Sequence, residues 1–192
     1  MSTIRFETTL LQIGDWTILR LPEEASAKLP SRGMTLVEGT INDFHSKIVL
    51  EPDGKGSHWF RVDSVLREAA GLEAGRRVKI SVESSKAWPE PEMPADLKTA
   101  LASDPQANAL WVEITPMARW DWLRWIRATN NRETRSHRIE VAMSKLKSGE
   151  RRPCCFNRNQ CTEPEVSKSG ILIDPIQTTK QKHPVEFKGQ KS

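Results

Sequence analysis

The chain has 192 residues, of which 37% are hydrophobic and 28% are charged, and this composition excludes global disorder. The length fits one large domain or two modest ones, and we expect two. The net charge is +4, and no stretch approaches the roughly 18 to 20 apolar residues of a membrane helix, so we expect no membrane span.

Residues 1–87 predict a β-rich domain. Strands are expected where apolar and polar residues alternate, or where short apolar runs end in turn residues. The expected strands are 4–8, 17–21, 34–41, 47–50, 58–62 and 78–82, for a total of six or seven. Asn42-Asp43 and the segment 52–56 supply turns, because Asn, Asp and Gly tolerate the backbone angles of tight reversals.

A weak internal repeat relates residues 18–37 to residues 59–79. Each copy reads as a strand, a short helix and a second strand, with the helices at 23–29 and 65–70. Asp63 or Ser64 is expected to cap the second helix. Two such units predict a small closed β-barrel of six or seven strands with a pseudo-twofold repeat, in an α+β protein.

A proline-rich linker is predicted at 88–94, followed by a helical domain over 95–164. Three prolines in this linker can continue neither a helix nor a central strand. Helices are expected at 95–102, 105–112, 116–128 and 132–147, and the last two should pack as a hairpin. Residues 165–192 are rich in Lys, Ser, Gln, Thr and Pro, which predicts a mobile tail.

The third expected helix carries tryptophans and arginines. Arg119, Trp120, Arg124 and Arg127 could form a stacking and electrostatic platform for single-stranded nucleic acid. A solvated basic face is the simpler interpretation, although residues 115–158 hold 11 basic against 4 acidic residues. Trp122 and Trp125 fall on the apolar face of the helix, which favours the core for both and leaves Trp120 partly exposed.

Three cysteines, Cys154, Cys155 and Cys161, lie within eight positions, a number and spacing typical of reduced thiols in the cytoplasm. With His137 or His183 they could supply four zinc ligands, but adjacent cysteines do not form the paired knuckle of a zinc site, so we expect no metal. The neighbours Arg151, Arg152 and Arg158 would lower a thiol pKa, so reactive thiols are an alternative. Simple packing of a loop is the favoured interpretation.

No motif for catalysis is present: the chain lacks a phosphate-binding glycine loop, a His-Glu-x-x-His helix and a Gly-x-Ser-x-Gly elbow. The four histidines are scattered along the sequence. We therefore expect no catalytic residues and no cofactor, and a protein that is not an enzyme.

Several elements of the second half resemble the YdeI/OmpD-associated family, also described as bacteriocin-protection proteins. They are Pro94-Ala95-Asp96-Leu97, Ala100-Leu101, Trp125-Ile126, Thr134-Arg135, Arg138-Ile139, the stretch Arg-Arg-Pro-Cys-Cys-Phe-Asn from Arg151, and Cys161-Thr162-x-Pro164. The first half resembles the small β-barrel domain of unknown function that commonly precedes this family's helical domain.

The resemblance implies a bacterial protein linked to envelope stress or bacteriocin tolerance, with no established reaction. It marks Thr134, Arg135 and Arg138 as candidate contact residues, although Arg135 could instead pair with a carboxylate such as Asp121. The favoured function is a cytosolic binding or adaptor protein whose groove or basic face meets an acidic protein surface or an anionic small ligand. Nucleic-acid binding is the alternative, and an enzyme or ligand site inside the barrel is a third.

Overall fold

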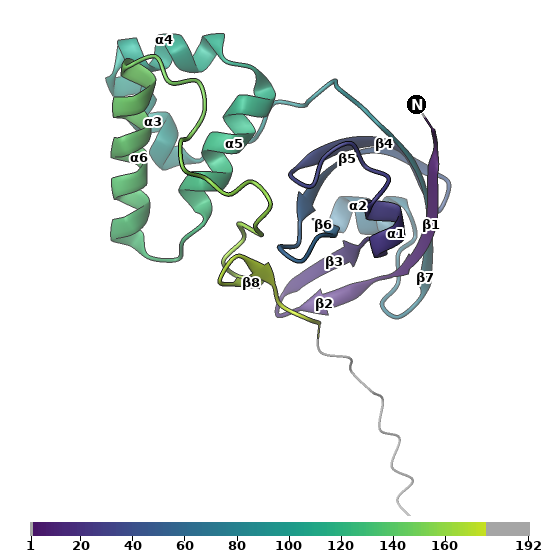
Figure 1. The fold of residues 1–192 in the computed structure, drawn as a ribbon. Coiled ribbons are helices and arrows are strands. Elements are labelled where there is room, and N and C mark those ends of the chain that lie inside the picture. The colour runs from purple at the N-terminus through teal and green to yellow at the C-terminus, as the bar shows by residue number, and fades with distance from the viewer. Residues whose placement is uncertain (1, 176–192) are drawn as a thin grey trace, which may run out of the picture.

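The structure, a computed structural model, describes residues 2–175 and has two parts (Figure 1). A curled antiparallel sheet forms the first part, and four helices form the second. An extended linker joins them, and the segment after the last helix returns to the sheet. The strands of the sheet are β1 (Ile4–Thr9), β2 (Leu11–Ile13), β3 (Trp16–Arg20), β4 (Thr35–Ile41), β5 (Phe44–Pro52), β6 (His58–Arg61) and β7 (Arg77–Ser84).

The seven strands follow the order β1-β7-β4-β5-β6-β3-β2, and every neighbouring pair is antiparallel. The tight turn between β4 and β5 has positive φ angles at Asn42 (43°) and Asp43 (67°), as the sequence predicts for these residue types. The concave side of the sheet encloses an apolar core that includes Leu19, Val37 and Phe60.

The sheet is open, so the predicted closed barrel and its internal repeat are not confirmed. β1 and β2 stand at opposite ends of the strand order, and only Leu10 separates them along the chain. The chain turns at this residue, so β1 pairs with β7 while β2 pairs with β3. A side-chain hydrogen bond links β1 to β3 across the open side of the sheet: Thr8 Oγ1 donates to the carbonyl oxygen of Arg20 (2.6 Å).

Two short helices, α1 (Glu23–Ser26) and α2 (Ser64–Ala69), cover the sheet part. Asp63 is the cap of α2, because its carboxylate accepts a hydrogen bond from the Leu66 amide (2.8 Å). His58 is fully buried under α1, where its ring hydrogen bonds with Ser26 Oγ (2.6 Å) and the Gly33 carbonyl (2.8 Å). Burial lowers the pKa of His58, so this histidine is a neutral structural residue.

The helices of the second part are α3 (Ala95–Ser103), α4 (Pro105–Glu113), α5 (Pro116–Arg127) and α6 (Arg132–Lys147). The side chains of Asp104, Thr115 and Asn131 cap the last three. Trp122 lies in the core of this part, and Trp125 packs edge-on against it with ring centroids 5.9 Å apart. No helix within residues 2–175 is long and apolar enough to cross a membrane.

Residues 165–175, which the sequence assigned to a mobile tail, include a short hairpin of β8 (Ser167–Lys168) and β9 (Ile171–Leu172). Val166 and Leu172 are buried against Trp59 and Cys161 in a cluster separate from the main core of the sheet. Apolar burial of this kind orders a segment that composition alone marks as polar. The remainder of the predicted tail, 176–192, lies outside the described residues.

The hairpin docks on the turn after β5. The Leu172 amide donates to the Asp53 carbonyl (2.8 Å), and Gly54 (φ 79°) faces Gly170 so closely that an added Cβ would lie 2.2 Å from the Gly170 oxygen. Gly56 also has a positive φ, 100°, but an added Cβ there would meet nothing within 4 Å.

We expect Gly54→Ala to destabilise the protein more than Gly56→Ala. Both changes strain a left-handed backbone by roughly 1 kcal/mol, but only the first also forces the hairpin away from its contact. Urea unfolding of both variants measures the difference, which should exceed about 1 kcal/mol. Equal losses of stability would show that the hairpin contributes no tight contact at this turn.

Candidate functional site

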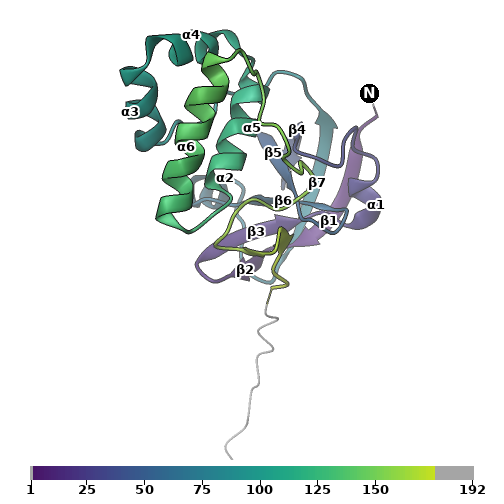
Figure 2. The same cartoon turned by 60° about the vertical axis from the view of Figure 1, so that its left-hand side comes forward.

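α5 is the helix nearest the sheet, and it carries the contacts between the two parts (Figure 2). Arg127 hydrogen bonds with Glu51 of β5, and its Nε lies 2.7 Å from Glu163 Oε1. Arg124, one turn earlier on α5, is fully buried with its Nε 3.6 Å from Glu51 Oε2. Two guanidinium groups and two carboxylates therefore form a buried cluster between sheet and helices.

The two carboxyl groups of this cluster have opposite pKa shifts. Burial alone would raise the pKa of Glu51, but Arg127 and Arg124 outweigh burial and hold it below its ordinary value. Burial raises the pKa of Glu163 to about 7, and the Glu51 charge adds to this effect, while Arg127 offsets only part of it. Glu51 is thus the permanent anion of the cluster, and Glu163 exchanges a proton near neutral pH.

Arg124 also anchors the segment that follows α6. Its guanidinium donates to the carbonyl oxygens of Gln160 (3.0 Å) and Arg158 (3.4 Å) and lies 5.4 Å from the centre of the Phe156 ring. Asp121 has a related role, since it pairs with Arg152 (3.2 Å) and with Arg158 (3.7 Å). Burial raises the pKa of Asp121, and the nearby arginines offset this in part.

Arg119 and Trp120, the other candidate binding residues on α5, hold the linker. Arg119 donates to the carbonyls of Trp111 (2.9 Å) and Val112 (2.7 Å) and pairs with Glu90 (2.6 Å). The indole N–H of Trp120 donates to the Pro89 carbonyl (2.9 Å). The arginines predicted for α5 therefore direct much of their hydrogen bonding toward this chain and leave few N–H groups for phosphate.

Two of the three candidates on α6, Arg135 and Arg138, also contact their own chain. Arg135 pairs with both carboxylate oxygens of Asp96 on α3, at 2.6 and 3.0 Å, so its partner is Asp96 and not the Asp121 considered from the sequence. Arg138 donates to the Trp125 carbonyl (2.7 Å). Thr134 is exposed in the first turn of the helix. The structure does not gather the seven candidates into one face.

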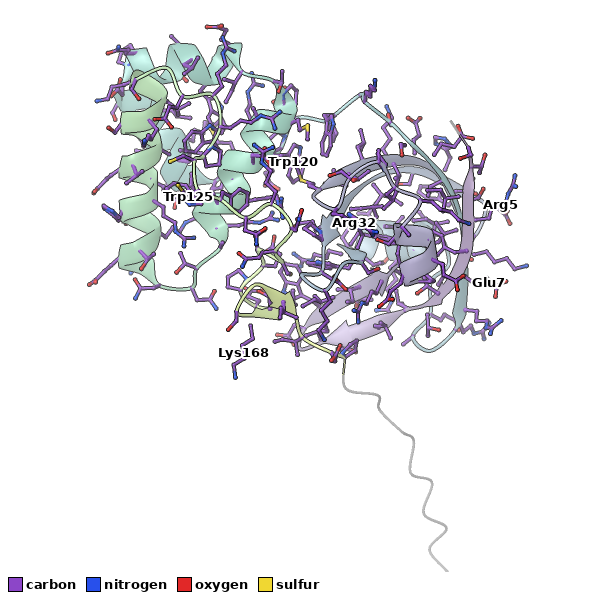
Figure 3. All side chains as sticks on the ribbon, viewed as in Figure 1. Arg5, Glu7, Arg32, Trp120, Trp125 and Lys168 are labelled. Carbon is purple, nitrogen blue, oxygen red and sulfur yellow. The ribbon has the colours of Figure 1, made fainter. Side chains whose placement is uncertain are left out.

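A cleft of about 810 Å³ lies between the sheet part and α5. Trp120 lines its helical side, and Figure 3 shows this side chain on the face of α5 toward the sheet. The other residues that matter here are Trp16, Phe44, Glu51, Trp59, Arg61, Val65, Arg127 and Glu163. Sequence reasoning missed most of them, because they come from five separate segments that no local pattern connects.

A second pocket, of about 370 Å³, lies where the C-terminal end of α5 and the first half of α6 meet the segment that follows α6. It brings together Arg138, Trp125 and two of the predicted thiols, Cys155 and Cys161. Cys154 is exposed like Cys155 but does not line this pocket. Burial raises the pKa of Cys161 to about 11, so this thiol stays protonated at neutral pH.

The arginines expected to activate the cysteines have carboxylate partners. Arg151 pairs with Glu113, while Arg152 and Arg158 share Asp121. Within residues 2–175 no three His, Cys, Asp or Glu side chains are grouped as a metal site requires, and His183 lies outside that range.

We expect Glu51→Gln to lower the free energy of unfolding by about 3 to 5 kcal/mol, because it removes the anion that compensates two buried guanidiniums. Denaturant unfolding checks the loss. Glu7→Gln is the matched control, since Glu7 pairs with Arg77 at the surface (2.9 Å) and should cost less than about 1 kcal/mol. Similar losses for the two variants would contradict a central role for the cluster.

Glu163 should make the protein less stable as pH rises. Its pKa in the fold is raised to about 7 from 4.5, so its stabilising contribution is complete below about pH 4.5 and is lost through pH 7. At about 1.4 kcal/mol per pH unit, the loss between about pH 5 and pH 8 is of order 2 to 3 kcal/mol. In Glu163→Gln this pH-dependent loss of stability should be absent. Denaturant unfolding of variant and parent at about pH 5 and about pH 8 measures the difference. If the free energy of unfolding changed equally with pH in both proteins, Glu163 would not be the titrating group.

The comparisons with known proteins divide the chain where the structure does. The family model for a domain of unknown function, DUF1905, matches residues 6–82, and the model described as bacteriocin-protection, YdeI or OmpD-associated matches residues 90–149. No curated protein matches the chain. The resemblance predicted from the sequence is confirmed: the first part of the chain matches the DUF1905 model and the second part matches the YdeI/OmpD-associated model, in the predicted order.

Proposed function

We propose that the chain is a non-enzymatic binding protein of the bacterial cytosol, whose ligand lies in the cleft between the sheet and α5. Its volume of about 810 Å³ falls within the roughly 300 to 1,000 Å³ typical of small-molecule sites. Ligand sites also occur preferentially where two domains meet. The sequence predicts a groove or a basic face without giving its position, and we propose this cleft as the groove.

The walls of the cleft favour an apolar body in the ligand. Phe44 and Val65 both line the cleft, and 38% and 74% of their surfaces are exposed, unusual for large apolar residues. The partly exposed Trp16 and Trp120 add aromatic surface. A planar or aliphatic group placed here would remove apolar surface of both ligand and protein from water.

Arg61 carries the proposal, because it is a cation of the cleft that makes no direct ion pair with a described residue. Its guanidinium lies 4.2 Å above the centre of the Trp16 ring, and no carboxylate within residues 2–175 forms an ion pair with it. The acidic groups of the cleft have other roles: Glu51 and Glu163 bind Arg127, Glu38 pairs with Lys47 (3.5 Å), and Asp63 caps α2. A carboxylate or phosphate on an apolar body is the complement of this arrangement.

The family match supports a link to bacteriocin protection or to OmpD, and an adaptor role remains part of the proposal. An amphiphilic anion bound between the two parts would contact both and stabilise their arrangement, which is how such a ligand could control an adaptor. The nucleic-acid alternative receives less support, because Arg119, Arg124 and Arg127 are used inside the protein.

Two fluorescent probes of similar shape test the site: anilinonaphthalene sulfonate, which is an anion, and the neutral N-phenyl-1-naphthylamine. We expect saturable binding of both to the full chain. Arg61→Gln should weaken the anion about tenfold and leave the neutral probe unchanged, because one charged hydrogen bond is lost. Val65→Asp should weaken both probes.

Arg5→Gln is the matched control, since Arg5 lies on the outer strand β1, away from α5 (Figure 3). It removes the same charge from the chain without touching the cleft. Equal effects of Arg5→Gln and Arg61→Gln on the anion, or binding that does not saturate, would reject the cleft as the site. Retention on single-stranded DNA that Arg61→Gln leaves unchanged would point to the nucleic-acid alternative.

A further inference from the structure

The second pocket is separate from the cleft and combines a cation with an exposed thiol. It is lined by the last turn of α5, by Arg138 of α6 and by the returning segment from Cys155 to Gly170. Polar side chains, among them Asn157, Gln160 and Thr162, make up much of its wall. Such a pocket suits a small polar molecule that carries hydrogen-bonding groups.

Arg138 supplies the charge of this pocket. One guanidinium nitrogen donates to the Trp125 carbonyl (2.7 Å), and the group lies 5.7 Å from the centre of the Trp125 ring. No carboxylate among residues 2–175 pairs with it, unlike Arg135 one turn earlier, which binds Asp96. A guanidinium has five N–H donors, so several remain for an anionic ligand.

The three cysteines differ in their access to this pocket. Cys155 is exposed and lines it, Cys154 is exposed but does not line it, and Cys161 lines it but is buried. Only Cys155 therefore combines solvent access with proximity to the ligand space that Arg138 borders. Cys161 does not compete as a nucleophile, because burial keeps it protonated.

We infer that Cys155 is a site of reversible mixed-disulfide formation with small anionic thiols, whose carboxylate binds Arg138. The co-reactant is a low-molecular-weight disulfide. The Cys155 thiolate attacks one sulfur, a new S–S bond forms, and the other half leaves as a thiolate that takes up the proton released by Cys155. A second small thiol reverses the reaction by the same exchange. Arg138 is a positioning residue, because it binds the incoming molecule and not the reacting sulfur.

Incubation of the full chain with glutathione disulfide, followed by intact-mass measurement and peptide mapping, tests the inference. We expect one glutathionyl group per chain, on Cys155, removed by dithiothreitol. Cys155→Ser should abolish the early modification, and Cys154→Ser should not change its rate. Modification of Cys154 and Cys155 at equal rates would overturn the inference, because it would show ordinary exposed thiols.

The charge of the probe separates recognition from simple reactivity. The parent protein should react about tenfold faster with glutathione disulfide than Arg138→Gln does, while cystamine, a cationic disulfide, should show no such loss. Arg132→Gln, at an exposed position on the same helix, is the matched control and should react like the parent. Arg138→Lys keeps the charge and should recover part of the rate, which guards against an effect of misfolding. Equal rates for Arg138→Gln and Arg132→Gln would overturn the role of Arg138.

Discussion

The two parts of this molecule are held together by a largely buried cluster of charged side chains. A guanidinium as buried as that of Arg124 costs several kcal/mol unless an anion and hydrogen-bond acceptors surround it. Glu51 supplies the anion from the sheet, and the carbonyls of the returning segment supply the acceptors. The sheet and the segment after α6 therefore both contact the Arg124 side chain of helix α5. The cleft exists because this contact fixes α5 beside β5 and β6.

Local patterns in the sequence predict most of the elements and little of their assembly. The helix at Arg132–Lys147 and the cap at Asp63 follow from residues close in the chain, and they are found as expected. The opening of the sheet depends on which strand accepts β1 and which accepts β2, and no local signal specifies that choice. The hairpin after Pro164 was missed because two apolar anchors in a polar segment become visible only when the surface that buries them is known.

The candidate sites show the same division. Basic residues of α5 and α6 stand out in composition, which makes them candidate contact residues, although a solvated basic face is the simpler interpretation. Helical phase correctly assigned Trp122 to the core, but it places Arg124 off the apolar face of the helix, and Arg124 is nevertheless as buried as that tryptophan. Of the arginines that line the cleft and the second pocket, Arg127 pairs with two carboxylates, whereas Arg61 and Arg138 have no carboxylate partner among the described residues. That property depends on long-range contacts, so sequence alone could not identify it.

Because the chain returns from α6 to the sheet, the choice of where to cut a fragment of such a protein affects whether that fragment folds. The family match to the helices ends at residue 149, before the segment that supplies partners for Arg124 and Asp121 and covers Trp59. A fragment cut there would retain every matched residue and still expose apolar and charged groups that the intact chain buries. The boundary of sequence similarity and the boundary of the folding unit therefore differ, and the shorter piece is a poor substitute for the protein in binding studies.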